Sequence, residues 1–247
     1  EQHRRDADSG QNDLFGLAEP SHADQPQTDL LEEVPEWHEE QLLRAEKETL
    51  GLYLSGHPID RYAEELAQFI PKKISELDAP ESKGYQRNEV PLLTAGLIVA
   101  IRTMITLDDQ TARLEVRVFG DIYEQYQSVI QPDKLVVIQG KIGQDNFSGG
   151  LAGTAESVYD LQKARELFGK SVQLTVKQHG EDAQWISQMQ AVMTPFCGGV
   201  IPVELKYANQ DAEVVIRLGH DWQITPSDTL LKELADLPGS ETVTMRY

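Results

Sequence analysis

Apolar residues are sparse at the start of the chain and become regular only further along. Acidic residues, Gln, Ser and Pro prevail over residues 1–35, and a segment of this composition buries too little apolar surface to offset its loss of conformational entropy. We therefore expect residues 1–35 to form a disordered acidic linker. One apolar island interrupts it, in the run Gln11-Asn12-Asp13-Leu14-Phe15-Gly16-Leu17.

Helical spacing follows this linker. Leu42, Leu43, Leu50 and Leu54 recur at roughly helical intervals, and the pattern stops at Gly56 and Pro58. These positions predict an amphipathic helix from about residue 36 to residue 56. A second short helix is expected over residues 60–70, after the break at Pro58. Together they form a helical segment, residues 36–88, that we expect to cap the next module.

From about Val90 the pattern becomes typical of strands. The stretch 92–105 is rich in Val, Ile and Leu, and the run Arg113–Phe119 alternates between apolar and polar residues. A short helix over 121–130 and strands within 135–138 and 151–159 complete the module. The order strand, strand, helix, strand, strand predicts an OB-fold β-barrel over residues 89–161. A five-stranded barrel needs one more strand between Ile105 and Leu107, where we expect no room for it.

The last part of the chain predicts an α+β domain over residues 162–247. A connecting helix over 162–168 precedes a strand at 172–176 and a helix at 182–196 with Trp and Met at core spacing. A hairpin around Asn209-Gln210-Asp211 follows, and Thr225–Asp228 opens a further helix by N-capping. Residues 242–247 form the final strand. This βαββαβ order predicts a ferredoxin-like domain.

Composition and charge narrow the function classes. The net charge of −19 restricts any nucleic-acid contact to a local, salt-sensitive patch. The single cysteine, Cys197, forms no internal disulfide and fits a reducing cytoplasm. No catalytic constellation, cofactor motif, metal cluster or membrane-spanning run is present, so we expect no catalysis, cofactor, metal or membrane, and we interpret His57 as a turn residue. Since the chain begins without Met, we expect it to be a fragment or a processed product.

Several motifs resemble one known family. The run Glu48-Thr49-Leu50-Gly51-Leu52-Tyr53-Leu54-Ser55-Gly56-His57-Pro58 resembles the segment before the OB domain in the alpha subunit of bacterial DNA polymerase III. Leu107-Asp108-Asp109, Arg113–Val116 and Asn146–Gly150 resemble that OB domain, and are loosely similar to the anticodon-binding OB domain of aminoacyl-tRNA synthetases. Gly-x-x-Trp-x-x-x-Pro-Ser-Asp, over Gly219–Asp228, resembles the C-terminal domain of the polymerase subunit.

The resemblance implies a peptide that holds the beta sliding clamp. Gln-x-Asp-Leu-Phe is similar to the peptide by which bacterial polymerases bind this clamp, and it lies upstream of Gly-His-Pro as in the family. Two apolar side chains would enter a pocket while an amide hydrogen-bonds at its edge. The predicted clamp-binding residues are Gln11, Asp13, Leu14 and Phe15.

Single-stranded DNA is the ligand that the family and the barrel imply for the central module. Cations that meet phosphates and aromatic rings that stack on bases form such sites. The candidates are Arg102, Arg113, Arg117, Phe119, Lys141 and Phe147. The alternative is an ordinary solvated strand face. The family carries a basic hairpin at the place of Ile105–Thr106. Either this protein lacks the hairpin, or the sequence joins the two ends of an omitted loop there, which is the interpretation we favour. Ala152 and Glu156 stand where family members often carry basic residues.

The resemblance also implies that the C-terminal domain binds the tau subunit of the clamp loader, in the region of Trp222, Pro226, Ser227 and Asp228. The metal-binding acids of the family lie upstream of the matching region. The leading hypothesis is therefore a cytoplasmic, non-catalytic region that tethers a replicative polymerase. Two alternatives stay open: a tRNA-binding accessory module of a synthetase-like enzyme, and a protein-interaction scaffold that binds no nucleic acid.

Overall fold

The computed structural model describes residues 36–78, 89–102, 104–145, 150–176, 183–208 and 213–247. Contacts divide the chain into two units, Glu1–Leu42 and Leu43–Tyr247. The second unit contains three clusters of buried apolar side chains. It holds the central module and the C-terminal domain, and the boundary between the units falls within the helix over Glu39–Leu50.

The first helix, α2 (Glu39–Leu50), ends earlier than the sequence predicts. Gly51 takes a positive φ of 75°, which glycine adopts without strain, and its N–H donates to the Lys47 carbonyl at 3.0 Å. The Glu46 carboxylate then accepts the backbone N–H of Leu54 at 2.7 Å and that of Ser55. The predicted extension to Gly56 is therefore wrong, because the chain turns back onto α2 at Gly51.

Short helical turns follow where one helix was predicted over residues 60–70. They are η1 (Asp60–Tyr62), α3 (Ala63–Leu66) and η2 (Ile74–Glu76). His57 lies in the preceding turn, where its backbone N–H donates to Asp60 at 3.0 Å and its Nδ1 accepts the N–H of Ile59. The interpretation of His57 as a turn residue is confirmed.

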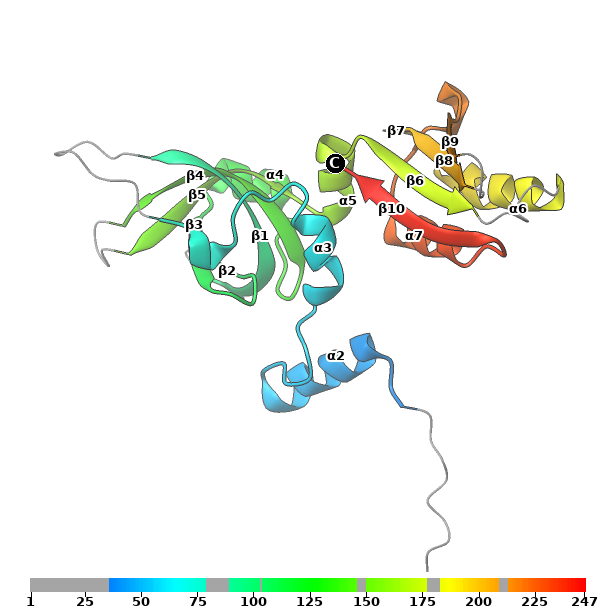
Figure 1. Cartoon of the computed structure of the whole chain (residues 1–247). Helices are drawn as coiled ribbons and strands as arrows, with labels where there is room; N and C mark the ends of the chain where they lie inside the picture. The colour runs from blue at the N-terminus through cyan, green and yellow to red at the C-terminus, as the bar shows by residue number, and fades with distance from the viewer. Residues whose placement is uncertain (1–35, 79–88, 103, 146–149, 177–182, 209–212) are drawn as a thin grey trace, which may run out of the picture. The chain divides into compact units, whose positions relative to one another are not determined.

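The central module is a closed barrel (Figure 1). Its strands are β1 (Val90–Ile101), β2 (Ile105–Asp108), β3 (Arg113–Arg117), β4 (Leu135–Gln144) and β5 (Leu151–Tyr159). Around the barrel the order is β1-β2-β3-β5-β4, with β3 and β5 parallel and the other pairs antiparallel. Helix α4 (Gly120–Tyr126) lies between β3 and β4 in sequence. Leu114 and Val116 face the core, as their alternation predicts.

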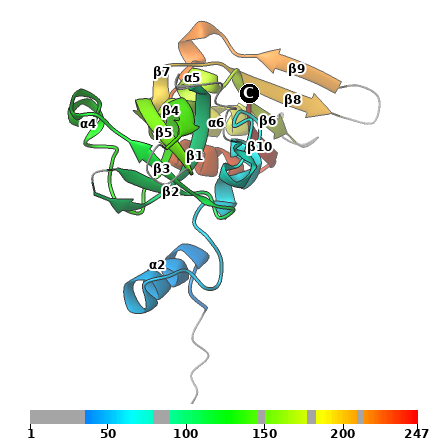
Figure 2. The same ribbon diagram turned by 90° about the vertical axis from the view of Figure 1, so that its left-hand side faces the viewer.

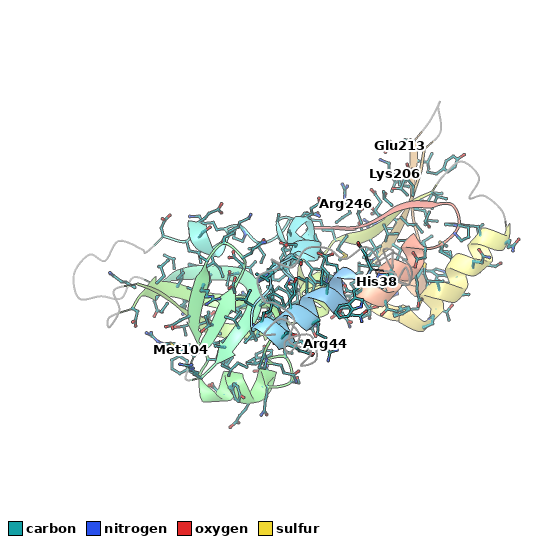
Figure 3. All side chains as sticks on the ribbon, turned by 90° about the horizontal axis from the view of Figure 1, so that it is seen from below. His38, Arg44, Met104, Lys206, Glu213 and Arg246 are labelled. Carbon is teal, nitrogen blue, oxygen red and sulfur yellow. The ribbon has the colours of Figure 1, made fainter. Side chains whose placement is uncertain are left out.

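The five strands β1 to β5 close the barrel by themselves. A further strand, which the sequence analysis expected to be needed between Ile105 and Leu107, is not required. The run 92–105, predicted as strand, forms most of β1 and, beyond Arg102 and Met104, the start of β2. Between the two strands the Arg102 N–H donates to the Met104 carbonyl at 3.0 Å, and Met104 is labelled in Figure 3. The prediction that no second strand fits before Leu107 is therefore wrong, because Ile105–Asp108 itself pairs with both β1 and β3.

The C-terminal domain follows α5 (Leu161–Phe168), the predicted connecting helix, which Asp160 caps by accepting the Lys163 N–H at 2.7 Å. Its further elements are β6 (Ser171–Val176), α6 (Ala183–Met193), η3 (Thr194–Phe196), β7 (Cys197–Ile201), β8 (Val203–Ala208), β9 (Glu213–Arg217), η4 (His220–Trp222), α7 (Asp228–Ala235) and β10 (Ser240–Arg246). Side chains of α6 and α7 pack with those of the sheet strands in one buried cluster.

The sheet order corrects the ferredoxin-like prediction. Along the chain a strand that was not predicted, β7, stands between α6 and β8, and the sheet order is β10-β6-β8-β9. The ferredoxin-like arrangement places another strand between the first two parallel strands, whereas β6 and β8 are direct parallel neighbours here. A hydrophobic pattern gives the type of each element but not which strands pair, so this difference was not predictable from periodicity.

Candidate functional site

The predicted clamp-binding residues Gln11, Asp13, Leu14 and Phe15 lie outside the described residues. Their role stays a prediction that rests on the sequence motif. Phe147, one of the two predicted base-stacking residues, also lies outside the described residues. The described part of the candidate site is therefore the set of barrel cations, Phe119 and the C-terminal residues.

Three of the four predicted phosphate-binding cations form ion pairs within the barrel. Arg113 donates to Asp108 at 2.9 Å, across the paired strands β2 and β3. Arg117 pairs with Asp145, which follows the end of β4.

The third ion pair joins Lys141 and Glu156 at 3.0 Å, and both side chains are half exposed. This hydrogen bond, together with the carboxylate charge, raises the pKa of Lys141 above its ordinary value. Exposed ion pairs of this kind are weak. An arriving phosphate competes with the carboxylate for each cation, so the positive potential of this face is locally neutralised.

The strand register brings two of these cations together. Arg117 on β3 and Lys141 on β4 each pair with Thr154 on the intervening strand β5. Glu156 is the extra residue at an irregularity in the pairing of β5 with β4, and its ion pair with Lys141 places its side chain on the same side of the sheet. The row Arg117, Thr154 and Lys141 is the strongest candidate for a phosphate contact, with Glu156 and Asp145 opposing it.

The remaining barrel candidates lie apart from this row. Arg102 is exposed in the turn after β1, and among the described residues it carries no ion pair. Phe119 is not on the alternating strand as predicted but is the N-cap residue of α4, with 58% of its surface exposed. An aromatic ring this exposed is available for stacking.

The predicted tau-binding residues have internal partners. Trp222 is half-buried against the core of the C-terminal domain. Ser227 caps α7, accepting the Leu230 N–H at 3.2 Å, and the Pro226 carbonyl accepts from Arg165 at 3.2 Å. Asp228 accepts from Arg165 at 2.6 Å and from the hydroxyl of Tyr62 at 2.6 Å. The motif around Pro-Ser-Asp therefore stabilises the domain at the start of α7.

Sequence reasoning missed the residue at the centre of these contacts. Arg165 on α5 is only 3% exposed, and it also binds Glu65 of α3 through two hydrogen bonds. The hydroxyl of Tyr247 donates to the same Glu65 carboxylate. A signal was present in the sequence, since Arg165 falls on the apolar stripe of α5 beside Ala164 and between Leu161 and Phe168 at helical spacing.

A groove of about 480 Å³ lies between α3 and the turn that joins β2 and β3. Apolar side chains such as Ile59 and Ala63 line it, and several of its polar groups have internal partners. Asp109 accepts the Ile74 N–H at 2.6 Å, and the Gln110 amide donates to Asp60 at 3.3 Å. The groove therefore presents few free polar groups that would orient a ligand.

Neither a metal site nor a membrane span is found in the described part of the chain. No group of three or more His, Cys, Asp or Glu side chains there is placed to hold a metal ion. No helix among the described residues is long and apolar enough to cross a membrane. Burial raises the pKa of the Cys197 thiol, which disfavours the reactive thiolate.

Comparisons with known proteins agree with the resemblance seen in the motifs. Residues 188–239 match the family model described as DNA polymerase III subunit alpha, C-terminal domain. The whole chain is 36% identical to DNA polymerase III subunit alpha of Vibrio cholerae, 34% to that of Escherichia coli K12 and 35% to that of Pseudomonas aeruginosa. It covers 21%, 22% and 21% of these relatives, about a fifth of their length.

Among solved structures, a chain of the S. pombe Stn1-ten1 complex is similar with a TM-score of 0.25 and 21% identity, over 31% of this chain and 59% of that one. The sequence matches identify a region of a bacterial replicative polymerase subunit. The family is the alpha subunit of DNA polymerase III, and this chain corresponds to its C-terminal part.

Proposed function

We propose that this chain is the non-catalytic tethering region of a replicative DNA polymerase alpha subunit in the cytoplasm. The observation that carries the proposal is the similarity of the whole chain to about a fifth of the alpha subunit, including the match to its C-terminal domain. We divide it into an acidic linker (1–35), a helical segment (36–88), an OB-fold (89–161) and a tau-binding domain (162–247). The strand order β1-β2-β3-β5-β4, with a helix after β3, supports the OB assignment.

The proposed mechanism joins several weak contacts. Gln11, Asp13, Leu14 and Phe15 hold the beta sliding clamp, the barrel contacts single-stranded template, and the C-terminal domain binds the tau subunit of the clamp loader. Each attachment raises the effective concentration of the others, so modest individual affinities suffice. The internal contacts of Ser227 and Asp228 favour a role in holding the shape of the tau-binding domain.

The test of the clamp contact is surface plasmon resonance of the whole chain on an immobilised beta clamp. The double variant Leu14→Ala, Phe15→Ala removes the two apolar anchors, and we expect a loss of affinity of roughly a hundredfold or more, as for hot-spot residues. The matched control is Leu30→Ala, Leu31→Ala, which removes two apolar side chains from the same linker. Equal affinity of both double variants and the wild type contradicts the assignment of the peptide.

A protein-interaction scaffold without nucleic-acid binding is the second candidate. The observation that favours it is the pairing of Arg113, Arg117 and Lys141 with carboxylates. Fluorescence anisotropy with a labelled single-stranded oligonucleotide distinguishes the two candidates. The tethering proposal predicts binding that weakens steeply with salt, because released counterions drive phosphate contacts. Absence of binding at low salt favours the scaffold.

A further inference from the structure

The outer strand of the C-terminal sheet, β9, carries an unusual exposed apolar run. All five of its residues are exposed, and 47% of Val214, 49% of Val215 and 52% of Ile216 are open to solvent. Within the described residues β9 pairs with β8 alone, so its other edge is unpaired (Figure 2). Edge strands are normally protected by Pro, bulges or central charges. β9 has its charges only at the ends, at Glu213 and Arg217.

The backbone groups that face the open edge follow from one hydrogen bond. The Leu218 N–H donates to the Val203 carbonyl at 2.9 Å, directed toward β8. In an antiparallel pair the residues alternate in direction, so the groups of Ile216 and Val214 also face β8. The N–H and C=O groups aimed at the open edge are those of Glu213, Val215 and Arg217.

We propose that β9 binds β9 of a second copy of this chain in an antiparallel, two-fold arrangement centred on Val215. In this register Val215 exchanges two hydrogen bonds with Val215 of the second copy. Glu213 lies opposite Arg217 of the second copy, and Arg217 opposite its Glu213. The N–H and C=O groups that bond across this interface are those of Glu213, Val215 and Arg217, which face the open edge. Such an isologous pair is the commonest symmetry of homodimers.

The side chains of both faces fit this register. On the face toward α6 and α7, Val214 packs against Ile216 of the second copy. On the opposite face Glu204 already binds Arg217 at 2.7 Å. Lys206 binds Glu213 at 2.8 Å, and these two residues are labelled in Figure 3. The row from Glu204 through Arg217 to Glu213 of the second copy therefore alternates in sign. Opposite charges directly across strands are stabilising.

Other registers satisfy the edge less well. Centring the pair on Glu213 or on Arg217 places like charges opposite each other, which is destabilising. Sliding one strand by one residue against the other aims backbone groups past each other, since direction alternates along the strand. Centring the pair on Val214 or Ile216 keeps the direction but pairs only three residues of each β9. Only the register centred on Val215 pairs all five residues of β9. The interface is small, so we expect a weak dimer with a Kd on the order of 100 μM, as for interfaces below standard size.

Sedimentation velocity of the whole chain over a range of concentrations tests the proposal. We expect a monomer–dimer equilibrium without larger species, because pairing uses up the edge. Arg217→Glu and Glu213→Arg each place like charges opposite each other and weaken the homodimer about tenfold. An equimolar mixture of the two variants opposes Glu to Arg at both ends, so heterodimers form with higher affinity than either variant homodimer. Misfolding would not be rescued by mixing.

A second variant removes one outward hydrogen bond. Val215→Pro deletes an N–H aimed at the open edge and leaves the bonds to β8, a position where edge strands tolerate proline. We expect dimerisation to fall at least tenfold. Val200→Thr is the matched control, because Val200 is 61% exposed and lies on β7, away from this edge. A chain that stays monomeric to several hundred micromolar, or a mixture that shows no rescue, overturns the proposal.

Discussion

The guanidinium of Arg165 donates to both carboxylate oxygens of Glu65, at 2.7 Å from Nε and 2.8 Å from Nη2, although the residues are 100 positions apart. The Arg165 side chain is 4% exposed and that of Glu65 is 17% exposed. A charge this buried is tolerated only when it is paired and hydrogen-bonded. Arg165 also binds Asp228, so one side chain of α5 connects α3 and α7.

Replacement of Arg165 tests how far these contacts stabilise the fold. Arg165→Met leaves the Glu65 carboxylate buried without its cation, and we expect the free energy of unfolding in urea to fall by about 3–5 kcal/mol, as for other broken buried pairs. Most of this loss is assigned to Glu65, because the Asp228 side chain is 57% exposed. The control is Arg44→Met, which breaks the exposed Arg44–Glu48 pair and changes stability by less than about 1 kcal/mol. Equal effects of both variants contradict the role of Arg165.

The pair of Tyr62 and Asp228 predicts a loss of stability at high pH. Partial burial, followed by the hydrogen bond to Asp228 and its charge, raises the pKa of Tyr62 from 10.0 to about 12. A group with a raised pKa in the folded state stabilises fully below its unfolded pKa, and this stability is lost as pH rises through the folded value. We therefore expect a loss between pH 10 and pH 12. Tyr62→Phe shows a smaller loss in this window when thermal unfolding is followed against pH.

The stability at low pH depends on Asp228, the other member of this pair. Burial works to raise the pKa of Asp228, but hydrogen bonds from Tyr62 and Arg165 outweigh it, and the pKa lies below its ordinary value. A lowered pKa gives stability that is present above the unfolded value and is lost as pH falls through the folded one. Asp228→Asn should therefore reduce the loss of stability that the wild type shows as pH falls below about 4. Identical pH profiles of the wild type and both variants would refute the coupling of these residues to stability.

Gly140 marks a close backbone approach within the barrel. It follows an irregularity in the pairing of β4 with β5, and a Cβ there would lie 2.0 Å from the Thr154 carbonyl oxygen. Since backbone must move to admit a methyl group, Gly140→Ala should destabilise the barrel by about 1–3 kcal/mol or more, measured by urea unfolding. Gly120→Ala is the matched control, because a Cβ there meets no atom within 4 Å. A variant at Gly140 as stable as the control would show that the strands relax freely.

The sequence predicted the elements better than their pairing. Ser227 at the start of α7 and Leu114 and Val116 inside the barrel were predicted, because caps and alternation are local signals. The turn at Arg102–Met104 was missed, because an apolar run gives no sign of a change in direction when the turn lacks Gly and Pro.

The long-range contacts were beyond any local signal. The direct pairing of β6 with β8 depends on the crossover through α6, and the bond between Arg165 and Glu65 joins segments far apart in the chain. The candidate cations of the barrel were chosen from the sequence because they are Arg or Lys residues on predicted strands. Their carboxylate partners were not, because Asp145 and Glu156 approach Arg117 and Lys141 only in the folded barrel.

The ion pair of Lys141 and Glu156 provides the sharpest test of single-strand binding by the barrel. If the barrel binds single-stranded DNA through Lys141, the Glu156 carboxylate competes with the phosphate. Glu156→Gln should then tighten binding about two- to fivefold at low salt, because it removes a like charge from the anionic ligand's path. Lys141→Gln should weaken binding and reduce the slope of log affinity against log salt by about 0.7. Fluorescence anisotropy over a salt series measures both the affinity and its salt dependence.

Lys206→Gln, in the C-terminal sheet, is the control and should leave the slope unchanged. If Glu156→Gln and Lys141→Gln shift affinity in the same direction, the row of Arg117, Thr154 and Lys141 is not the phosphate site.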